Sequence, residues 1–558
     1  MRRRATAFVG ASRPSTAAVL WAAALSAIML TGCPLMGPLD LRPGPEGEHW
    51  LRFVHLSDAH ITDTESPARL VTMDAFLSPA WHPQDGHSAQ VLDATCRAIN
   101  RIHYGGFVTD KGPVDFVVVS GDVVDNAQHN ELRWFIDTMD GQWVTPDSGD
   151  LDAPLRPVAI EDNPGLPFKA AGLAKDIPWY TVMGNHDNLA VGNFAVDRSS
   201  ADPQDWDAPV SPIVAQFLGL PGLSPPQDGL VPTGNQSLAV VRAGDPEPID
   251  PYTFQLNLDE LAPGAVPADS GRHFLSKRLF VAEHFDTASL PAGHGFDYTS
   301  TLTGLAHYSV RPERDVPIRL VVLDSTGPEA IPGYTGAAGA ISRLEFDGFL
   351  KPEFRRAREA GEYVIVVTHH PSEGLTKPTA LPCVTPAEFQ SYLAAQSNIL
   401  AHLCGHDHYH EVIIRNGRYP YPEILTGSLI DYPQEGRMLD IYYDEAAETF
   451  HIESTFITHA DRPTRLSAEA YLRATTDMVV SPDSPEWAEH MYNLDLSDLE
   501  SYLQQAHDKT KSQPPQDNTL AQYLDGASLP PATAPSPRPP SERTSTIVVC
   551  RPAAPGGR

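Results

Sequence analysis

Five short polar clusters in this chain follow directly behind runs of apolar, β-branched residues. In chain order they read Asp58-Ala59-His60, Gly121-Asp122-Val123-Val124-Asp125, Gly184-Asn185-His186-Asp187, Thr368-His369-His370-Pro371 and Gly405-His406-Asp407-His408. Together they offer oxygen atoms and imidazole nitrogens, the mixture that binds Mn, Fe or Zn in preference to a thiolate-seeking metal. The residue types therefore point to a metal centre.

The clusters are too far apart in sequence to form one local loop, so a sheet must bring them together. If the strands lie side by side in an α/β fold, every cluster is placed at the same edge of the sheet, at the carboxyl ends of the strands. Apolar runs predict these strands at 51–56, 116–119, 179–183, 363–367 and 399–403, with further strands at 320–325, 423–425, 438–443 and 449–455. Apolar periodicity predicts helices at 88–104, 131–139 and 342–359, with Ser88 in position to cap the first.

The set of motifs resembles the calcineurin-like metallophosphoesterase family. The resemblance implies an α/β fold, a four-layer α/β/β/α sandwich of two mixed sheets, here with large loop insertions and a helical C-terminal extension. It also implies two divalent or trivalent metal ions (Mn, Fe or Zn) with these ligands: Asp58, His60 and His408 on the first ion, Asn185, His369 and His406 on the second, and Asp122 bridging both.

The resemblance also implies the catalytic groups. His186 matches a histidine that binds no metal and either stabilises the transition-state oxyanion or protonates the leaving alkoxide. We expect Asp187 to orient His186, and Asp125 to support a ligand or to cap a helix. A hydroxide held between the two ions would attack phosphorus in line with the leaving oxygen, without a covalent enzyme intermediate.

Each cluster taken alone also fits an ordinary turn or helix cap. All five in family order, each behind a strand, argue against coincidence. His370 competes with His369 as a ligand; the family pattern favours His369, and His370 then lines the pocket. Four other histidines are expected to be structural, exposed or outside any ligand position, namely His55, His129, His402 and His410.

Several activities remain open within this family. The form Thr368-His369-His370-Pro371 resembles the cyclic-nucleotide and glycerophosphodiester branch, which favours a phosphodiesterase acting on small diesters over a phosphomonoesterase. A 5′-nucleotidase is less favoured because no second nucleotide-binding domain is evident. Purple acid phosphatases carry Tyr at the Asp125 position and lack a histidine at the His60 position, so a tyrosinate-ligated ferric site is not expected. A catalytically silent surface-binding lipoprotein is the alternative from another class.

Net charge restricts the partners. The chain carries 71 acidic against 40 basic residues, a formal charge of −31. Binding to the nucleic-acid backbone needs clustered Lys and Arg, so binding to a duplex is not expected. A small phosphoester would be drawn in by bound cations and not by the field of the protein itself. The sequence does not indicate an oligomeric state.

The amino-terminal segment has the features of an export signal. Arg2, Arg3 and Arg4 precede an apolar run at 17–30 that is short for a membrane span. The run ends in Leu30-Thr31-Gly32-Cys33, which resembles the cleavage box of bacterial lipoproteins, with Cys33 as the lipidated residue. We therefore expect an exported protein anchored by lipid to a bacterial membrane, at its periplasmic face or at the cell surface. An ordinary signal peptide with a chance cysteine is the alternative.

Composition divides the rest of the chain. We expect a signal peptide at 1–32, a tether at 33–50, a metallophosphoesterase domain at 51–460 with a substrate-side insertion at 190–317, a helical extension at 461–512, and a Pro-rich, largely disordered tail at 513–558. Residues 547–550 are apolar enough to add a last strand. Four cysteines (Cys96, Cys383, Cys404 and Cys550) allow three pairings, between which the sequence does not choose.

Overall fold

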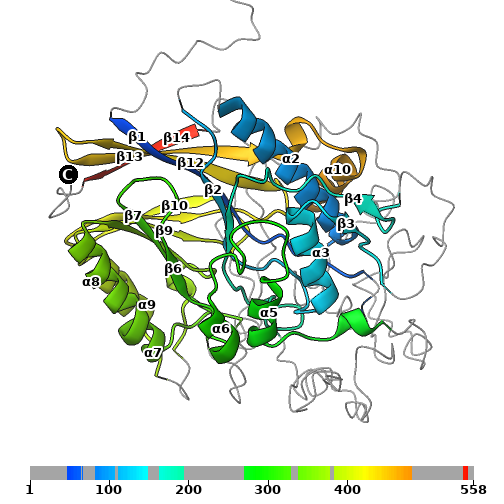
Figure 1. Cartoon of the computed structure of the whole chain (residues 1–558), viewed down its shortest axis with the longest axis horizontal. Helices are drawn as coiled ribbons and strands as arrows, with labels where there is room; N and C mark the ends of the chain where they lie inside the picture. The colour runs from blue at the N-terminus through cyan, green and yellow to red at the C-terminus, as the bar shows by residue number, and fades with distance from the viewer. Residues whose placement is uncertain are drawn as a thin grey trace, which may run out of the picture. The chain divides into compact units, whose positions relative to one another are not determined.

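The β-branched runs form the strands of a six-stranded mixed sheet in the computed structural model of the chain (Figure 1). Its order is β14 (Thr544–Cys550), β13 (Thr449–Thr458), β12 (Glu435–Asp444), β1 (Glu48–Leu56), β2 (Phe116–Val119) and β5 (Trp179–Thr181). Strands β1, β2 and β5 run parallel, β12 pairs antiparallel with β1, and β13 and β14 each add a further antiparallel pair. The first three clusters therefore leave one edge of this sheet together.

A second six-stranded mixed sheet carries the last two clusters. Its order is β10 (Glu411–Arg415), β11 (Tyr421–Leu425), β9 (Ile399–Cys404), β8 (Tyr363–Val367), β7 (Ile318–Val322) and β6 (Tyr308–Val310). The four inner strands are parallel, and β10 and β6 close the two edges as antiparallel strands.

Successive side chains of a strand enter different hydrophobic cores, and this shows how the layers stack. Leu320 and Val322 of β7 belong to the core shared with the first sheet, whereas Val321 lies in a separate core beneath the helices. Neighbouring side chains of a strand point to opposite faces, so the second sheet is buried on both sides. The outer core contains Phe354 of α8 (Lys351–Ala360) and Phe389 of α9 (Pro386–Leu393).

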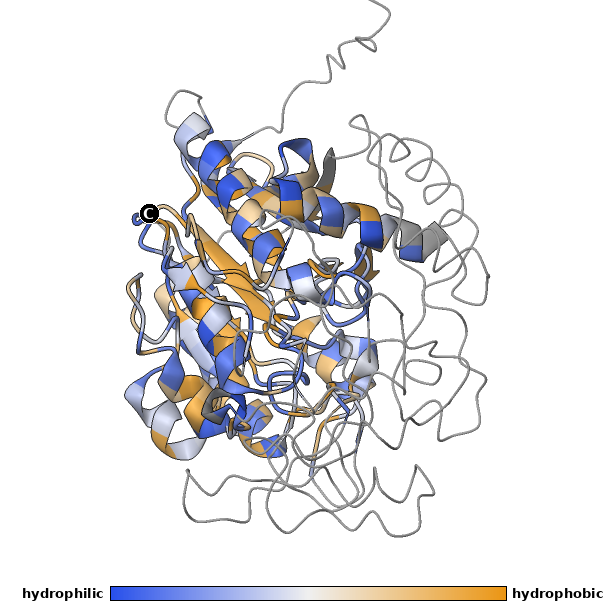
Figure 2. Ribbon diagram, turned by 90° about the vertical axis from the view of Figure 1, so that its right-hand side faces the viewer, coloured by the Kyte–Doolittle hydropathy of each residue, from blue (hydrophilic) through white to orange (hydrophobic). Residues whose placement is uncertain are grey.

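Two helices cover the outer face of the first sheet. They are α2 (Ser88–Gly106) and α3 (His129–Met139), which pack against each other, and Phe135 of α3 meets Trp179 of β5 edge to face at 5.8 Å. Colouring by hydropathy shows apolar strands between helices whose outer faces are polar (Figure 2). The predicted α/β/β/α order of two mixed sheets is confirmed.

Most of the predicted elements are present. The helical run predicted at 342–359 is formed by α7 (Arg343–Glu345), a π-helical turn η6 (Phe346–Leu350) and α8, and Ser342 caps it by accepting a hydrogen bond from the Glu345 amide. Ser88 differs from expectation, because a 3-10 turn, η3 (Asp85–His87), precedes α2. The Ser88 hydroxyl instead accepts a hydrogen bond from the Thr62 amide at 3.1 Å.

The boundaries expected from composition differ from the structure in three places. Strand β1 begins at Glu48, inside the expected tether. The later part of the expected insertion forms α5 (Lys277–Glu283), α6 (Tyr298–Thr303) and β6, and Phe280 and Phe296 join the main core. Strand β14 lies inside the tail expected to be largely disordered and contains the last strand expected at 547–550. The helix α6 and the strand β6 are short, so their apolar periodicity does not rise above that of the surrounding loops.

Smaller elements complete the unit Gly47–Arg558. They are a ribbon of β3 (Trp143–Val144) and β4 (Phe168–Lys169), helix α10 (Arg465–Val479), which begins the expected extension, and the 3-10 turns η5 (Ser270–Arg272), η7 (Ser372–Gly374) and η8 (His459–Asp461). The structure describes residues 47–64, 66, 82–106, 111–148, 163–193, 269–327, 337–377, 382–479 and 544–550. The expected signal peptide, the lipidation site Cys33, residues 194–268 of the insertion and residues 480–543 lie outside them. Among the described helices, none is both long and apolar enough to cross a bilayer.

Candidate metal centre

Five of the seven expected ligands adopt a left-handed backbone conformation. The φ angles are +53° at Asp58, +42° at His60, +48° at Asp122, +71° at His406 and +57° at His408. Such a conformation is uncommon outside glycine and costs about 1–3 kcal/mol at each residue, so it persists only where the surroundings fix it. At each of these residues the backbone turns sharply after its strand, and the turn directs the side chain toward a common point.

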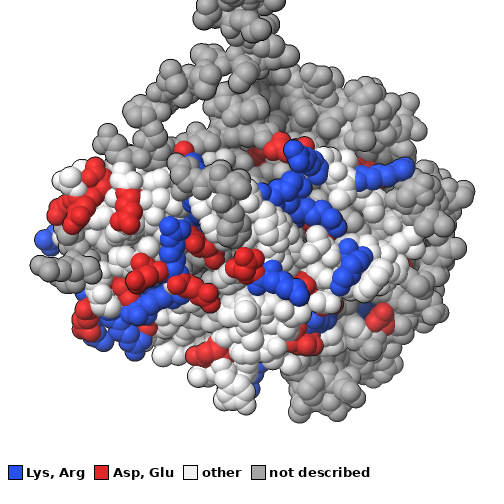
Figure 3. Space-filling view, turned by 45° about the horizontal axis from the view of Figure 1, so that its top comes forward, with Lys and Arg blue, Asp and Glu red and all other residues white. Residues whose placement is uncertain are grey.

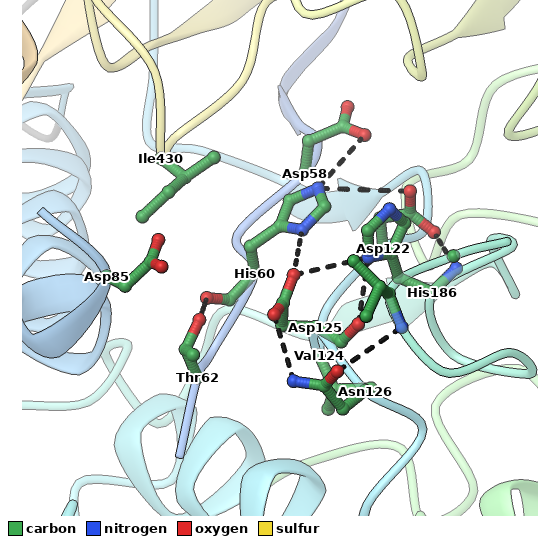
Figure 4. A network of polar contacts seen from close by, with 12 residues as sticks. Asp58, His60, Thr62, Asp85, Asp122, Val124, Asp125, Asn126, His186 and Ile430 are labelled. Atoms are coloured by element: carbon green, nitrogen blue, oxygen red, sulfur yellow. Dashed lines mark hydrogen bonds and ion pairs between the residues drawn. The ribbon is translucent and has the colours of Figure 1, made fainter. Parts of the chain in front are cut away.

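The ligands expected for the first ion converge. His408 Nε2 lies 3.4 Å from Asp58 Oδ1, and His60 Nε2 lies 3.9 Å from the same oxygen. Asp58 Oδ1 and His60 Nε2 are buried atoms to which no hydrogen bond is made in the described part of the chain. Buried polar atoms normally have partners, and a cation between these two would provide one. Figure 4 shows Asp58, His60 and Asp122 turned toward one another.

The ligands expected for the second ion meet around one nitrogen. His369 Nε2 lies 3.1 Å from Asp122 Oδ2, 3.0 Å from Asn185 Oδ1 and 3.2 Å from His406 Nδ1. Asp122 Oδ2 is also 3.9 Å from His60 Nε2 in the first half of the site. One carboxylate oxygen thus faces both halves, as a bridging ligand must. The structure brings all seven predicted ligands together.

The far nitrogen of three of these histidines is held by a hydrogen-bond acceptor. His60 Nδ1 donates to Asp125 Oδ1 at 3.1 Å, His369 Nδ1 to the Ser120 carbonyl at 2.8 Å, and His408 Nδ1 to Asp431 Oδ2 at 2.5 Å. A proton fixed on Nδ1 leaves Nε2 with a free lone pair, the form in which histidine binds a metal. Asp125 therefore supports a ligand, one of its two expected roles. It does not cap α3, whose N-cap residue is Gln128.

Electrostatics in the site favour added positive charge. Burial alone would raise the pKa of Asp58 and of Asp122, but His408 and His369 respectively outweigh it and hold both carboxylates ionised. Burial would lower the pKa of His369, yet Asp122 raises it to about 9. Burial, followed by the nearby His369, lowers the pKa of His406 to about 3 and keeps that ring neutral. The ionised carboxylates and the neutral ring of His406 are donors suited to cations.

His186 is oriented by Asp125, and this corrects the expected role of Asp187. His186 Nδ1 donates to the Asp125 carbonyl at 2.8 Å and lies 3.2 Å from Asp125 Oδ1. Asp187 instead accepts from the amides of Val123, Val124 and Gly184 at 2.9, 3.1 and 2.7 Å. The tight turn directs the Asp187 carboxylate at backbone amides, so Asp187 braces the loops that carry Asp122 and Asn185.

Burial would lower the pKa of His186, but Asp122, followed by Asp125, raises it. The imidazole therefore tends to carry a proton. Sequence reasoning missed Gly192, where φ is +63° and where a Cβ would overlap His186 Nε2. The only sign of this in the sequence is the glycine itself, the residue type that allows the backbone to lie against a ring at a positive φ.

The remaining histidines of the motif regions have structural roles. His370 Nδ1 contacts Ser325 Oγ at 2.9 Å, and its Nε2 lies 3.2 Å from the Ala337 carbonyl. Although His370 lies within reach of His369 and His406, it is the Nε2 of His369 that faces Asp122 and Asn185, which favours His369 as the ligand. The others make buried or surface contacts: His55 with Ser120 and Thr426, His129 with Glu283, His402 with Thr368, and His410 with the Gly427 amide.

A second group of potential ligands, His402, Cys404 and Glu423, lies buried behind the fifth cluster. Arg415 binds both Glu423 oxygens, with its Nε at 2.9 Å from one and its Nη2 at 3.1 Å from the other. The Ser372 amide and hydroxyl donate to the same carboxylate. The charge of Glu423 is therefore already neutralised, and we interpret this group as a structural ion pair. Cys96, Cys383 and Cys404 are buried free thiols.

Gly405 lets the fifth cluster pass close behind the first. A Cβ at this position would overlap Ser57 Oγ and lie 2.6 Å from Asp58 Oδ2. Gly405→Ala is therefore expected to lower the free energy of unfolding by about 1–3 kcal/mol, the usual cost of overpacking. Because the added methyl displaces Asp58, Mn²⁺ should also raise the melting temperature of the variant less than that of the wild type. Thermal unfolding with and without Mn²⁺ measures both effects.

Gly105→Ala in α2 is the matched control, because a Cβ there meets no atom within 4 Å. It should melt no lower than the wild type, since alanine is the better helix former, and should respond fully to Mn²⁺. Wild-type melting and a wild-type Mn²⁺ response in Gly405→Ala would show that this close approach is dispensable.

Comparisons with known proteins come from a family model and from solved structures. The model of the calcineurin-like phosphoesterase family matches residues 51–410. A dimetal phosphatase from Danio rerio aligns at 12% identity over 74% of this chain and 100% of its own, with a TM-score of 0.36. The sulfate thiohydrolase SoxB of Thermus thermophilus, in complex with glycerol, aligns at 12% identity over 78% of this chain and 61% of its own, with a TM-score of 0.29. Among curated proteins, none matches this sequence.

Proposed function

The chain belongs to the calcineurin-like phosphoesterase family, and on that premise we propose that it is a phosphodiesterase that cleaves small diesters at the centre around Asp122. Membership of this family implies metal-dependent hydrolysis of phosphoric esters. The diester preference and the role of each side chain are our proposals. The observation that carries the hydrolase assignment and the ligand roles is the convergence of the seven expected ligands, two of which bring buried atoms without hydrogen-bond partners among the described residues.

The residues present fit a pair of metal ions. Asp58, His60 and His408 would hold one ion, Asn185, His369 and His406 the other, and Asp122 would lie between them. When bound, such a pair polarises the phosphoryl oxygens and supplies an ionised water as nucleophile near neutral pH. The ligand atoms are oxygens and imidazole nitrogens, which leaves Mn, Fe and Zn as candidates.

The protein's own contribution to the reaction centres on His186. Its Nδ1 is fixed by Asp125, its backbone amide donates to Asp122 Oδ1 at 2.8 Å, and its ring centroid lies 4.4 Å from that of His60. These contacts hold the imidazole beside the ligand cluster, within reach of His60 and Asp122, and we assign it a catalytic role there. From there it donates a proton or a hydrogen bond to the oxygen that gains negative charge as the ester bond breaks.

Two features support a diester over a monoester. The form Thr368-His369-His370-Pro371 is the one noted above for diester-cleaving relatives. Charge gives the second, because a monoester carries up to two negative charges near neutral pH and a diester carries one. A protein with a net charge of −31 repels the diester less.

A nuclease acting on duplexes is less favoured. On the face drawn in Figure 3, basic and acidic side chains lie side by side and form no continuous basic stripe. A phosphomonoesterase or nucleotidase is the second candidate, because the same metal centre serves both reactions.

We also propose that the protein is exported and anchored by lipid on Cys33 to a bacterial membrane, at the periplasmic face or the cell surface. The basic start at Arg2–Arg4, the apolar run at 17–30 and the box Leu30-Thr31-Gly32-Cys33 support this proposal. Metabolic labelling of the expressed full chain with a fatty-acid analogue tests it. Labelling should disappear in Cys33→Ser, and an unlabelled wild type would contradict the anchor.

The activity is tested with purified protein, chromogenic diester and monoester substrates, and controlled metal. Bis(p-nitrophenyl) phosphate should be hydrolysed in Mn²⁺ with a higher kcat/KM than p-nitrophenyl phosphate. Prolonged dialysis against EDTA should abolish turnover, and added Mn²⁺ should restore it, because the proposed reaction needs metal ions bound by these ligands. A higher kcat/KM for the monoester would support the phosphomonoesterase alternative. Bound metal without turnover of either ester would support the catalytically silent lipoprotein.

A further inference from the structure

His408 is held by a residue that lies outside all five clusters. Its Nδ1 donates to Asp431 Oδ2 at 2.5 Å, and its Nε2 lies 3.4 Å from Asp58 Oδ1 in the proposed first metal site. Asp431 sits in the loop between β11 and β12, and about four-fifths of its side chain is buried, with a relative exposure of 21%. One imidazole therefore links the proposed first metal site to a carboxylate from a different loop.

Asp431 is itself fixed in place. Its backbone amide donates to Ser428 Oγ at 2.9 Å. Its second oxygen, Oδ1, lies 3.4 Å from Gln84 Nε2, which donates to it, and 3.5 Å from His82 Nε2. His82 is anchored on the other side by Asp85, whose Oδ1 is 3.2 Å from His82 Nδ1. One oxygen of Asp431 thus holds His408, while the other is held by the segment that precedes α2.

We propose that Asp431, backed by His82 and Gln84, is a positioning residue for the first metal site, fixing the tautomer and orientation of His408. The proposal rests on the proposed function, because it takes His408 as a metal ligand. A carboxylate on the far nitrogen of a ligating histidine holds the proton there, turns the free lone pair to the metal and raises the basicity of the ring. His369 in the second site, by contrast, is held on its far nitrogen by the neutral Ser120 carbonyl.

Another aspartate–histidine pair in the molecule shows what a purely structural contact looks like. His103 Nε2 lies 3.1 Å from Asp176 Oδ2, a longer contact with a more exposed carboxylate. The other nitrogen of His103 faces the Val114 carbonyl, so both sides of that ring are taken by the protein. The other nitrogen of His408 instead faces Asp58 Oδ1, an atom of a proposed metal ligand, at 3.4 Å. Asp176→Asn is therefore the matched control for Asp431→Asn.

The test titrates metal-free protein with Co²⁺ by calorimetry and follows the visible absorption of the bound ion. Wild-type protein should show two binding events. In Asp431→Asn one event should weaken about 10–100-fold, the usual effect of losing such a partner, while the other keeps its affinity. The Co²⁺ absorption of the weakened site should change, a readout that a merely structural role would not move. Asp176→Asn should bind both ions as the wild type does.

Two further variants keep the result decisive. His82→Gln leaves Asp431 in place and should weaken the same event by a smaller factor, and Asp431→Glu should restore part of the affinity. Two unchanged binding events in Asp431→Asn, or equal weakening of both, would overturn the positioning role while the proposed function stands. A wild-type protein that binds no Co²⁺, Mn²⁺ or Zn²⁺ would overturn the proposed function itself and the positioning role with it.

Discussion

Asp122→Asn is expected to release both metal ions and to abolish measurable diester hydrolysis. One oxygen of Asp122 lies 3.1 Å from His369 Nε2 and 3.9 Å from His60 Nε2, and the other accepts the His186 amide at 2.8 Å. Asparagine keeps the size and the second contact but removes the negative charge that two close cations need. Losing several kcal/mol of charge stabilisation corresponds to a fall in kcat of about 10³-fold or more.

Elemental analysis after gel filtration and steady-state kinetics in Mn²⁺ measure the two effects of Asp122→Asn. The control is Asp440→Asn, which removes a carboxylate that is equally buried but bound to Arg52 Nε at 2.7 Å on β1. That variant leaves Arg52 without its buried partner, so it should melt at a lower temperature yet retain both ions. Full metal content and wild-type turnover in Asp122→Asn would rule out the bridging role.

His186→Gln is expected to lower kcat by about 10²–10³-fold, the range for loss of a proton donor or an oxyanion-stabilising group. Glutamine can still hydrogen-bond to the Asp125 carbonyl, but it has no titratable nitrogen to give a proton to the leaving oxygen. Metal content should stay at the wild-type level, because His186 is beside the ligands and not among them. KM should change little, since the lost interaction forms as the ester bond breaks.

The control for this variant is His284→Gln. His284 is fully buried at the end of α5, and its Nδ1 donates to the Phe280 carbonyl at 2.7 Å. Its replacement should affect stability and leave kcat unchanged. Loss of bound metal in His186→Gln would make His186 a ligand and contradict the assignment. Wild-type kcat with full metal content would exclude it from the chemistry.

Local pattern was enough to predict much of the scaffold and all the expected ligands. A buried strand needs a run of apolar residues, and a polar cluster behind it can be recognised without knowing what it faces. Residues 116–119 and 363–367 were predicted as strands with these bounds. The seven ligands proposed from the clusters all lie in the site. In contrast, the short elements α6 and β6, inside the expected insertion, had too few apolar residues to stand out.

The side chains that support the site were less predictable. Asp187 follows His186 directly in the chain and was expected to orient it, yet the hydrogen bond comes from Asp125, which is distant in sequence. Asp431 belongs to no motif and gave no signal at all. Such partners depend on how closely two loops approach each other in the folded protein, and no local sequence pattern indicates which loops will meet.

Strand formation and ligand chemistry are local properties, so the residues alone indicate which side-chain types gather behind which strands and what kind of metal centre to expect. The direction of each side chain depends on how the two sheets pack together. The left-handed turns at Asp58, His60, Asp122, His406 and His408 and the close approach at Gly405 set those directions. Backbone strain of this kind persists because packing from both sheets holds it in place, so it becomes visible only when the sheets are assembled.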